Sequence, residues 1–156
     1  MSEQAKALPA QHSAKSVSGR ISWRDYLELT KPRVVALMIL TSVIGMLLAA
    51  PGVPGWDILL FGNLGIALLA GAAAVVNHVV DQKIDTVMAR TRKRPVATGR
   101  IAPFDAILFA VMLAAAGMIV LIWQVNELTA WLTLASLVGY AGVYTLFLKR
   151  ATPQNI

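Results

Sequence analysis

Cysteine is absent from the 156-residue chain, and charged side chains are scarce. Without cysteine, neither a disulfide framework nor a cysteine-based metal site can form. Charged residues make up 14% of the chain and hydrophobic residues 57%, a balance that a water-soluble domain does not tolerate. The mean hydropathy of +0.65 is typical instead of a protein that crosses a membrane several times.

The first residues lack the apolar core of a secretory signal peptide. Residues 1–20 are polar and include Lys6, Lys15 and Arg20, so we expect no cleaved signal and interpret residues 1–22 as a disordered cytoplasmic tail. The net charge is +6. Because the basic residues lie between apolar runs, they indicate membrane topology rather than nucleic-acid binding.

Four apolar stretches have about the length that crosses a ~30 Å hydrocarbon core, for which about 20 residues are needed. The predicted transmembrane helices are residues 34–50, 58–80, 106–125 and 128–148. We expect the second helix to run on past Asp85. Short connections pair the helices into two hairpins, so residues 23–156 are predicted to form an all-α, polytopic transmembrane helical bundle.

The distribution of basic residues predicts the orientation of these helices. Of the 14 Lys and Arg residues, six precede the first span, six lie between the second and third, and two follow the fourth. The positive-inside rule therefore places the N-terminus and the 81–103 loop in the cytoplasm. Trp56, Trp123 and Trp131 would then form an aromatic belt at the outer interface.

A short helix is predicted before the first span. Ser22-Trp23-Arg24-Asp25 has the pattern of a capping box, which would open a helix over residues 23–30. Its apolar face would lie among the lipid headgroups, or the helix would simply lead into the span that starts at Pro32. The residues that share this face are Trp23, Tyr26, Leu27 and Thr30.

Small residues gather at 67–74 and at 139–142. In lipid, apolar side chains gain nothing by leaving the bilayer, so helices associate where small residues let their backbones approach closely. The two runs predict tight helix packing, with the second span central in the bundle and its polar end facing an interior cavity.

That polar end carries Asn77, Asp81 and Asp85, each four residues from the next. The spacing places all three on one helix face. Two carboxylates at a helix C-terminus oppose the macrodipole and repel each other, and ionisable groups at a membrane edge are usually functional. A bound divalent cation would remove both penalties, and Mg²⁺ fits because it takes oxygen ligands and shares its shell with phosphate.

Alternative interpretations of these residues stay open. The two acids can be solvated and paired with Lys83 or the arginines, and His78 is more typical of a packing or hydrogen-bonding histidine than of a ligand. The basic run that follows can serve only as a topology determinant, or it can clamp a diphosphate by bidentate contacts. This run consists of Arg90, Arg92, Lys93 and Arg94.

The string from Asn77 to Ile101 resembles the first aspartate-rich motif of the UbiA superfamily of intramembrane prenyltransferases. Two further segments resemble the protohaem farnesyltransferase (haem O synthase) family in particular. They are Leu29-Thr30-Lys31-Pro32-Arg33 and the terminal Lys149-Arg150-Ala151-Thr152-Pro153-Gln154-Asn155-Ile156, and the Met88-Ala89-Arg90-Thr91 spacing agrees with them. The resemblance extends from Tyr26 to the last residue.

The resemblance implies transfer of a farnesyl group from farnesyl diphosphate to a vinyl group of haem B, with Mg²⁺ as cofactor. Asn77, Asp81 and Asp85 would bind the metal and act in catalysis. Arg90, Arg92, Lys93 and Arg94 would bind the diphosphate. It also implies a bacterial inner (cytoplasmic) membrane location, no nucleic-acid partner, and hand-over of product to haem A synthase or to terminal oxidase assembly.

The chain departs from the family pattern in one respect. Members form a nine-helix bundle with a second aspartate-containing motif in a later cytoplasmic loop, and no residue of this chain matches that motif. We therefore expect residues 23–156 to be the N-terminal part of the prenyltransferase membrane domain, a truncated fragment that shows no farnesyl transfer by itself.

Three other functions remain, one of which is a non-catalytic assembly fragment that only expression data could address. Another UbiA-type prenyltransferase would share the chemistry and act on an aromatic acceptor, and product identification with parallel acceptors separates the two. A small membrane cation carrier would use the acids to line a pathway; metal flux without any diphosphate requirement would favour it.

Overall fold

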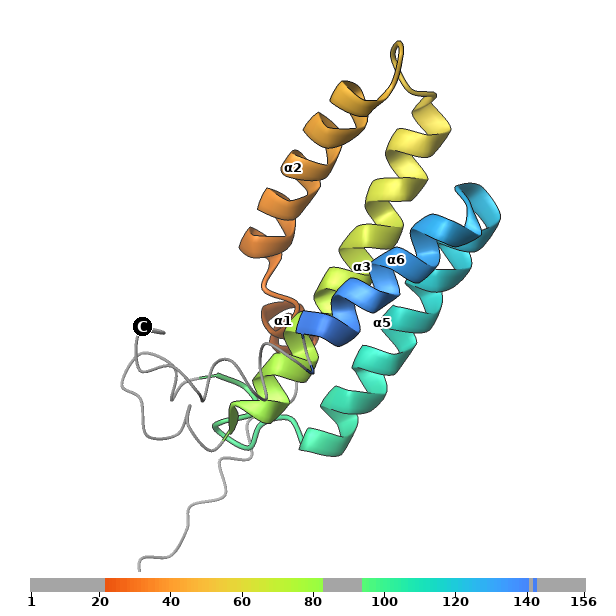
Figure 1. Cartoon of the computed structure of the whole chain (residues 1–156). Coiled ribbons are helices and arrows are strands. Elements are labelled where there is room, and N and C mark those ends of the chain that lie inside the picture. Colours follow the sequence, from red (N-terminus) through yellow and green to blue (C-terminus); the bar gives the residue numbers. More distant parts are fainter. Residues whose placement is uncertain (1–21, 83–93, 141, 143–156) are drawn as a thin grey trace, which may run out of the picture.

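The computed structural model describes residues 22–82, 94–140 and 142, and the regular structure of this part of the chain is entirely helical. Figure 1 shows its five helices, which confirm the all-α prediction. They are α1 (Trp23–Leu29), α2 (Pro32–Ala49), α3 (Trp56–Val80), α5 (Pro103–Gln124) and α6 (Glu127–Val138).

Three of the described helices are long and apolar enough to cross a membrane. They are α2, α3 and α5, with 18, 25 and 22 residues, and they agree with the first three predicted spans. The fourth predicted span, 128–148, begins as the shorter apolar helix α6, and most of its second half lies outside the described residues. The chain thus has the helices of a multi-pass membrane protein.

Helix α1 begins with the predicted capping box. The Ser22 side chain accepts a hydrogen bond from the Arg24 backbone N–H, and Asp25 Oδ2 accepts one from the Ser22 N–H at 3.0 Å. These contacts satisfy donors that an uncapped helix start would leave open. The helix ends at Leu29, with Thr30 as its C-cap, and Pro32 is the first residue of α2.

Helix α3 is the central element of the described bundle. It lies between α2 and α5 in Figure 1, and it contacts all four of the other described helices. Its buried residues include Gly71 and the three alanines 72–74, whereas α2 has none buried. The predicted central position of this helix and the tight packing of its small residues are therefore confirmed.

Helices α3 and α5 approach each other closely at two glycines, Gly65 and Gly117. A Cβ atom added to Gly117 would lie 3.0 Å from the backbone oxygen of Gly65 and 3.1 Å from Leu68 Cβ. A Cβ added to Gly65 would lie 3.3 Å from the backbone oxygen of Gly117. The two backbones meet here because neither residue has a side chain.

The second run of small residues, 139–142, lies in open surroundings at its two glycines. A Cβ added to Gly139 or Gly142 would meet nothing within 4 Å. The prediction of tight packing at 139–142 is therefore wrong for the part of the chain that the structure describes, because no described helix lies against these glycines.

A buried cluster holds together the end of the bundle that carries Asn77 and Asp81. It joins α1, α3, α5 and the loop before α5, and the Tyr26 and Phe109 rings pack edge to face at 5.0 Å against it. The buried members of the cluster are Leu29, Ala72, Val75, Val96, Ile101, Ala106 and Ala110.

The loop that leads into α5 is held at both of its ends. Gln82 Nε2 donates to the Val96 carbonyl at 3.2 Å, which fixes the loop to the end of α3. Arg100 Nη1 lies 2.7 Å from Asp25 Oδ1, which fixes it to α1. The buried Asp25 side chain therefore makes two contacts: it caps the start of α1, and it forms an ion pair with Arg100 of the loop.

Gly117→Val should destabilise the bundle, because its branched side chain must push α3 away from α5. Overpacking costs about 1–3 kcal/mol, so we expect the melting temperature of the purified protein in detergent to fall by at least about 2 °C. Gly45→Val is the matched control, since a Cβ at this mid-helix glycine of α2 meets nothing within 4 Å. Equal melting temperatures for the two variants would contradict the proposed contact.

Asp25→Asn should loosen the loop 94–101, because the amide keeps the cap acceptor and loses the charge that binds Arg100. A loss of about 1 kcal/mol corresponds to about five-fold faster amide hydrogen exchange in this loop, measured by mass spectrometry. Glu28→Gln removes an exposed charge from the same helix and should leave the exchange unchanged. Unchanged exchange in Asp25→Asn would show that the ion pair does not hold the loop.

Candidate functional site

The polar end of α3 forms the core of the candidate site. Asn77 lies in the last turn of α3 and Asp81 is its C-cap, and both are buried, with 5% and 3% of their surface exposed. With the amide oriented so that both its ends are satisfied, Asn77 Nδ2 donates to Asp81 Oδ2 at 3.2 Å. The structure thus brings these two residues together on one face, as their spacing predicts.

The helix itself ends earlier than expected. Helix α3 stops at Val80, and Asp81 has φ −83° and ψ −3°, away from the helical ψ of about −42°. The predicted continuation past Asp85 is interrupted at Asp81, the C-cap of α3; Gln82 is again helical, and Asp85 lies outside the described residues.

Several predicted site residues lie outside the described residues, and their roles stay predictions. These are Asp85, Arg90, Arg92 and Lys93. Arg94 is described and half-buried, and its backbone oxygen accepts hydrogen bonds from the Thr98 N–H at 2.9 Å and the Thr98 hydroxyl at 3.0 Å. The Gln82–Val96 hydrogen bond holds this loop against the end of α3.

Lys31 is the residue that the sequence did not single out for the site. Its Nζ donates to the same Asn77 side chain, at 2.9 Å from Oδ1. Lys31, Asn77 and Asp81 therefore form one contiguous polar cluster from the start of α2 to the end of α3. Two signals pointed to it: a basic residue directly before a proline at a span start, and the family resemblance of the segment Leu29–Arg33.

His78 neighbours this cluster and is 3% exposed. Its burial in the last turn of α3 agrees with a packing histidine, and that role stays a prediction.

The donor set of the cluster suits Mg²⁺. Asp81 supplies a carboxylate and Asn77 an amide oxygen, both hard oxygen donors. Within the described ranges, no group of three His, Cys, Asp or Glu residues gathers into a metal cage. Mg²⁺ characteristically uses one or two carboxylates and completes its shell with phosphate oxygens and water, so the described residues fit it.

A cavity of about 340 Å³ opens next to Lys31, between α2, α3 and α6. Its walls are apolar apart from Lys31 and a few hydroxyl groups. Thr133 and Ser136 donate their hydroxyls to carbonyls of their own helix, at 2.7 and 2.9 Å, so they add little polarity. The other walls include Met38, Ala70, Ala73 and Leu137. This cavity suits an apolar chain whose polar head lies near Lys31.

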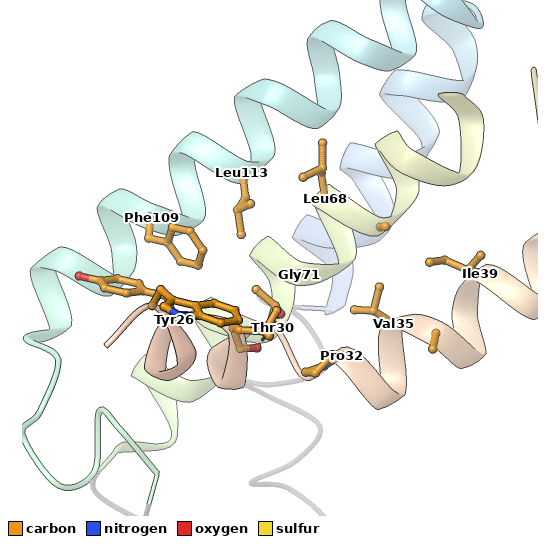
Figure 2. Close-up of a pocket in the computed structure, with 13 residues that line it drawn as sticks. Tyr26, Thr30, Pro32, Val35, Ile39, Leu68, Gly71, Phe109 and Leu113 are labelled. Atoms are coloured by element: carbon orange, nitrogen blue, oxygen red, sulfur yellow. Dashed lines mark hydrogen bonds between the residues drawn. The ribbon is translucent and has the colours of Figure 1, made fainter. Parts of the chain in front are cut away.

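A second hollow, of about 550 Å³, lies on the other side of Thr30, between α1, α2, α3 and α5. Figure 2 shows Tyr26, Phe109 and Leu113 lining it opposite Val35 and Ile39. The predicted apolar face of α1 lines this hollow, and the Thr30 hydroxyl donates to the Leu27 carbonyl at 2.8 Å. Lys31, Asn77 and Asp81 do not line this hollow, so it can pack apolar groups but brings no group of the polar cluster to them.

The sequence has close relatives. Residues 38–156 match the UbiA prenyltransferase family. The chain is 87% identical over 151 residues to a protein named protoheme IX farnesyltransferase from Marinobacter nauticus, which covers 97% of this chain and 49% of the relative. Identity to the protein of the same name from Saccharophagus degradans is 71% over 134 residues, or 86% of the chain and 44% of the relative.

A third relative of that name, from Hahella chejuensis, is 65% identical over 141 residues, or 90% of the chain and 47% of the relative. The chain thus spans about half the length of the curated relatives it matches. No solved structure matches it. With the match over residues 38–156, the chain belongs to the UbiA prenyltransferase family.

Proposed function

We propose that this chain forms one half of the diphosphate site of an Mg²⁺-dependent protohaem farnesyltransferase, which makes haem O from haem B and farnesyl diphosphate. The observation that carries the proposal is the buried Asn77–Asp81 pair at the end of α3. It occurs in a chain 87% identical to a protein named protoheme IX farnesyltransferase.

In this proposal, Asn77, Asp81 and Asp85 would hold Mg²⁺ where the diphosphate binds. The metal supplies neutralisation of the charge that develops on the leaving diphosphate. UbiA-family prenyltransferases generally bind their diphosphate substrates with Mg²⁺, and the donor set of the described residues is compatible with it.

The basic run completes the clamp. Arg90, Arg92, Lys93 and Arg94 would donate hydrogen bonds to the diphosphate oxygens, which hold most negative charge once the allylic C–O bond breaks. The C–O electron pair leaves with the diphosphate, the haem vinyl group forms the new C–C bond, and water adds at the remaining cationic carbon and loses a proton.

The apolar cavity beside Lys31 supports an isoprenoid substrate. Its position between α2, α3 and α6 would accommodate part of a farnesyl chain while the polar head stays at the cluster. An apolar wall also keeps water from a reactive allylic cation until the acceptor has attacked.

We further propose a bacterial inner-membrane location with the Asn77–Asp81 end in the cytoplasm. All 14 basic residues flank this end of the spans. Trp56 begins α3 and Trp123 lies in the last turn of α5, so both are at the end of the bundle away from Asn77 and Asp81. They are 83% and 79% exposed, as residues of an interfacial belt would be. Haem O would pass from there to haem A synthase or to terminal oxidase assembly.

A chimera tests the proposal. This chain would replace the matching half of the Marinobacter nauticus relative, which is feasible at 87% identity. We expect the purified chimera to form haem O from haem B, farnesyl diphosphate and Mg²⁺, identified by mass. Asp81→Asn should lower kcat at least about 100-fold, because a carboxylate that acts on the transition state has lost its charge.

Asp105→Asn is the control, since this exposed aspartate at the start of α5 lies outside the cluster; it should retain full activity. Supplying 4-hydroxybenzoate in parallel tests the acceptor. If the chimera forms a prenylated benzoate and no haem O, the proposed function is wrong and the protein is an aromatic prenyltransferase. If the protein carries metal ions into proteoliposomes without any diphosphate, the proposed function is wrong and the protein is a cation carrier.

A further inference from the structure

We propose that the hollow of about 550 Å³ between α1, α2, α3 and α5 binds one anionic phospholipid, with an acyl chain in the hollow and the phosphate on Arg24. This lipid site is separate from the proposed substrate site and does not depend on the proposed function. The bound lipid takes no part in a reaction.

The walls of the hollow suit a hydrocarbon chain. They are aliphatic or aromatic except at Thr30, whose hydroxyl already donates to the Leu27 carbonyl at 2.8 Å. The Tyr26 and Phe109 rings pack edge to face at 5.0 Å, and Figure 2 shows them on the side of the hollow opposite Val35. Water in this space would find few hydrogen-bond partners, whereas an apolar chain would contact most of the walls.

Small residues of α2 and α3 leave room for such a chain. Ala36, Ala67 and Gly71 line the hollow. A Cβ added to Gly71 would lie 3.4 Å from Thr30 Cβ and 3.7 Å from Leu113 Cδ1. In lipid, small residues commonly mark places where two helices touch, whereas these three line a space between helices. Larger side chains at the same positions would fill it.

The hollow lies apart from the polar cluster of Lys31, Asn77 and Asp81. The cavity of about 340 Å³ beside that cluster is lined by α2, α3 and α6, and the hollow by α1, α2, α3 and α5. Thr30 and Val35 line both spaces and therefore lie between them. A ligand in the hollow is thus kept from the residues that would hold Mg²⁺, which favours a bound lipid over a reacting substrate.

The hollow is open where a lipid headgroup would lie. Trp23 and Leu27 of α1 line it and are still 69% and 45% exposed. Helix α1 comes directly before Pro32, the first residue of a helix long enough to span the membrane. Tryptophan is enriched at the level where spans leave the hydrocarbon core. A lipid whose chain enters beside Trp23 would therefore have its phosphate at the level of α1.

Arg24 supplies a charge that is complementary to an anionic headgroup. Its guanidinium carbon lies 6.0 Å from the centroid of the Trp23 ring, so the cation is held next to a wall of the hollow. Arg24 is exposed and forms no ion pair with a described residue, Glu28 one turn further along α1 included. Arg100, by contrast, is bound to Asp25 at 2.7 Å.

A guanidinium group with free donors can bind a phosphate through two parallel hydrogen bonds. Basic pockets between transmembrane helices bind anionic lipid headgroups in this way. Arg24 beside an apolar hollow combines the two features that a phospholipid requires, a cation at the membrane surface and a space for a chain below it.

Native mass spectrometry of the purified protein in a neutral detergent tests the lipid site without any variant. The protein would be titrated with phosphatidylglycerol and, separately, with phosphatidylcholine of the same acyl chains. We expect one phosphatidylglycerol to bind at least about ten-fold more tightly, because hydrogen bonds to a charged group are worth about this factor or more. Equal affinities for the two lipids would overturn the inference.

Arg24→Gln tests the headgroup contact. It should weaken phosphatidylglycerol binding about ten-fold and leave phosphatidylcholine binding nearly unchanged. Arg33→Gln is the matched control, because Arg33 is also exposed but lies about 100° round α2 from Pro32, which lines the hollow. If the two variants lose affinity equally, the lipid is attracted by the basic end as a whole, and the inference is wrong.

Ala36→Phe tests the hollow. Its ring should occupy the space of the chain and weaken the binding of both lipids at least about ten-fold. Ala115→Phe is the control, since this exposed alanine of α5 does not line the hollow. Unchanged lipid affinity in folded Ala36→Phe would overturn the inference. If Ala36→Phe does not fold, the lipid preference of the wild type and the Arg24→Gln variant decide.

Two other occupants would be recognised in the same spectra. If farnesyl diphosphate with Mg²⁺ displaces phosphatidylglycerol, the hollow belongs to the substrate site and the inference is wrong. If the wild type binds no phosphatidylglycerol and forms a dimer that Ala36→Phe dissociates, the hollow is an interface between two copies of the chain, and the inference is again wrong. The proposed function fails separately, since a chimera that makes no haem O would leave lipid binding by this chain unaffected.

Discussion

The contact on which the rest of the structure depends is the close approach of α3 and α5 at Gly65 and Gly117. In a bilayer the helices gain little from hiding apolar side chains, so backbone proximity between small residues has to hold them together. This contact makes α3 the central helix. The polar end of α3 then faces the interior of the bundle, and the buried cluster around Val75 and Ile101 positions the loop that carries Arg94.

Burial of Asp81 beside a membrane is tolerable because its neighbours compensate for it. An isolated charge in an apolar interior is very costly, and a charge within a hydrogen-bonded group is much less so. Asn77 lies between Asp81 and Lys31 and contacts both, as a donor to one and an acceptor for the other. The cluster is therefore organised by its own hydrogen bonds, which would suit the proposed role in electrostatic stabilisation.

Much of this arrangement follows from local patterns. The capping box at Ser22, the apolar lengths of α2, α3 and α5, and the pairing of Asn77 with Asp81 were all predictable, since each depends on residues close together in the chain. The break of α3 at Asp81 was not, because periodicity alone continues through that residue. The open surroundings of Gly139 also escaped prediction, since a small residue permits a close contact without supplying the helix that makes it.

The sequence by itself determined that the chain is a helical membrane protein, and it located an acidic motif followed by cations at one membrane edge. Hydropathy, charge asymmetry and i,i+4 spacing are properties of short segments, so no tertiary information was needed for them. Only the tertiary structure decided that Lys31 belongs with Asn77, and that an apolar cavity adjoins them. The physical reason is that a contact between two helices depends on how α1, α2 and α3 pack, which no spacing along one helix encodes.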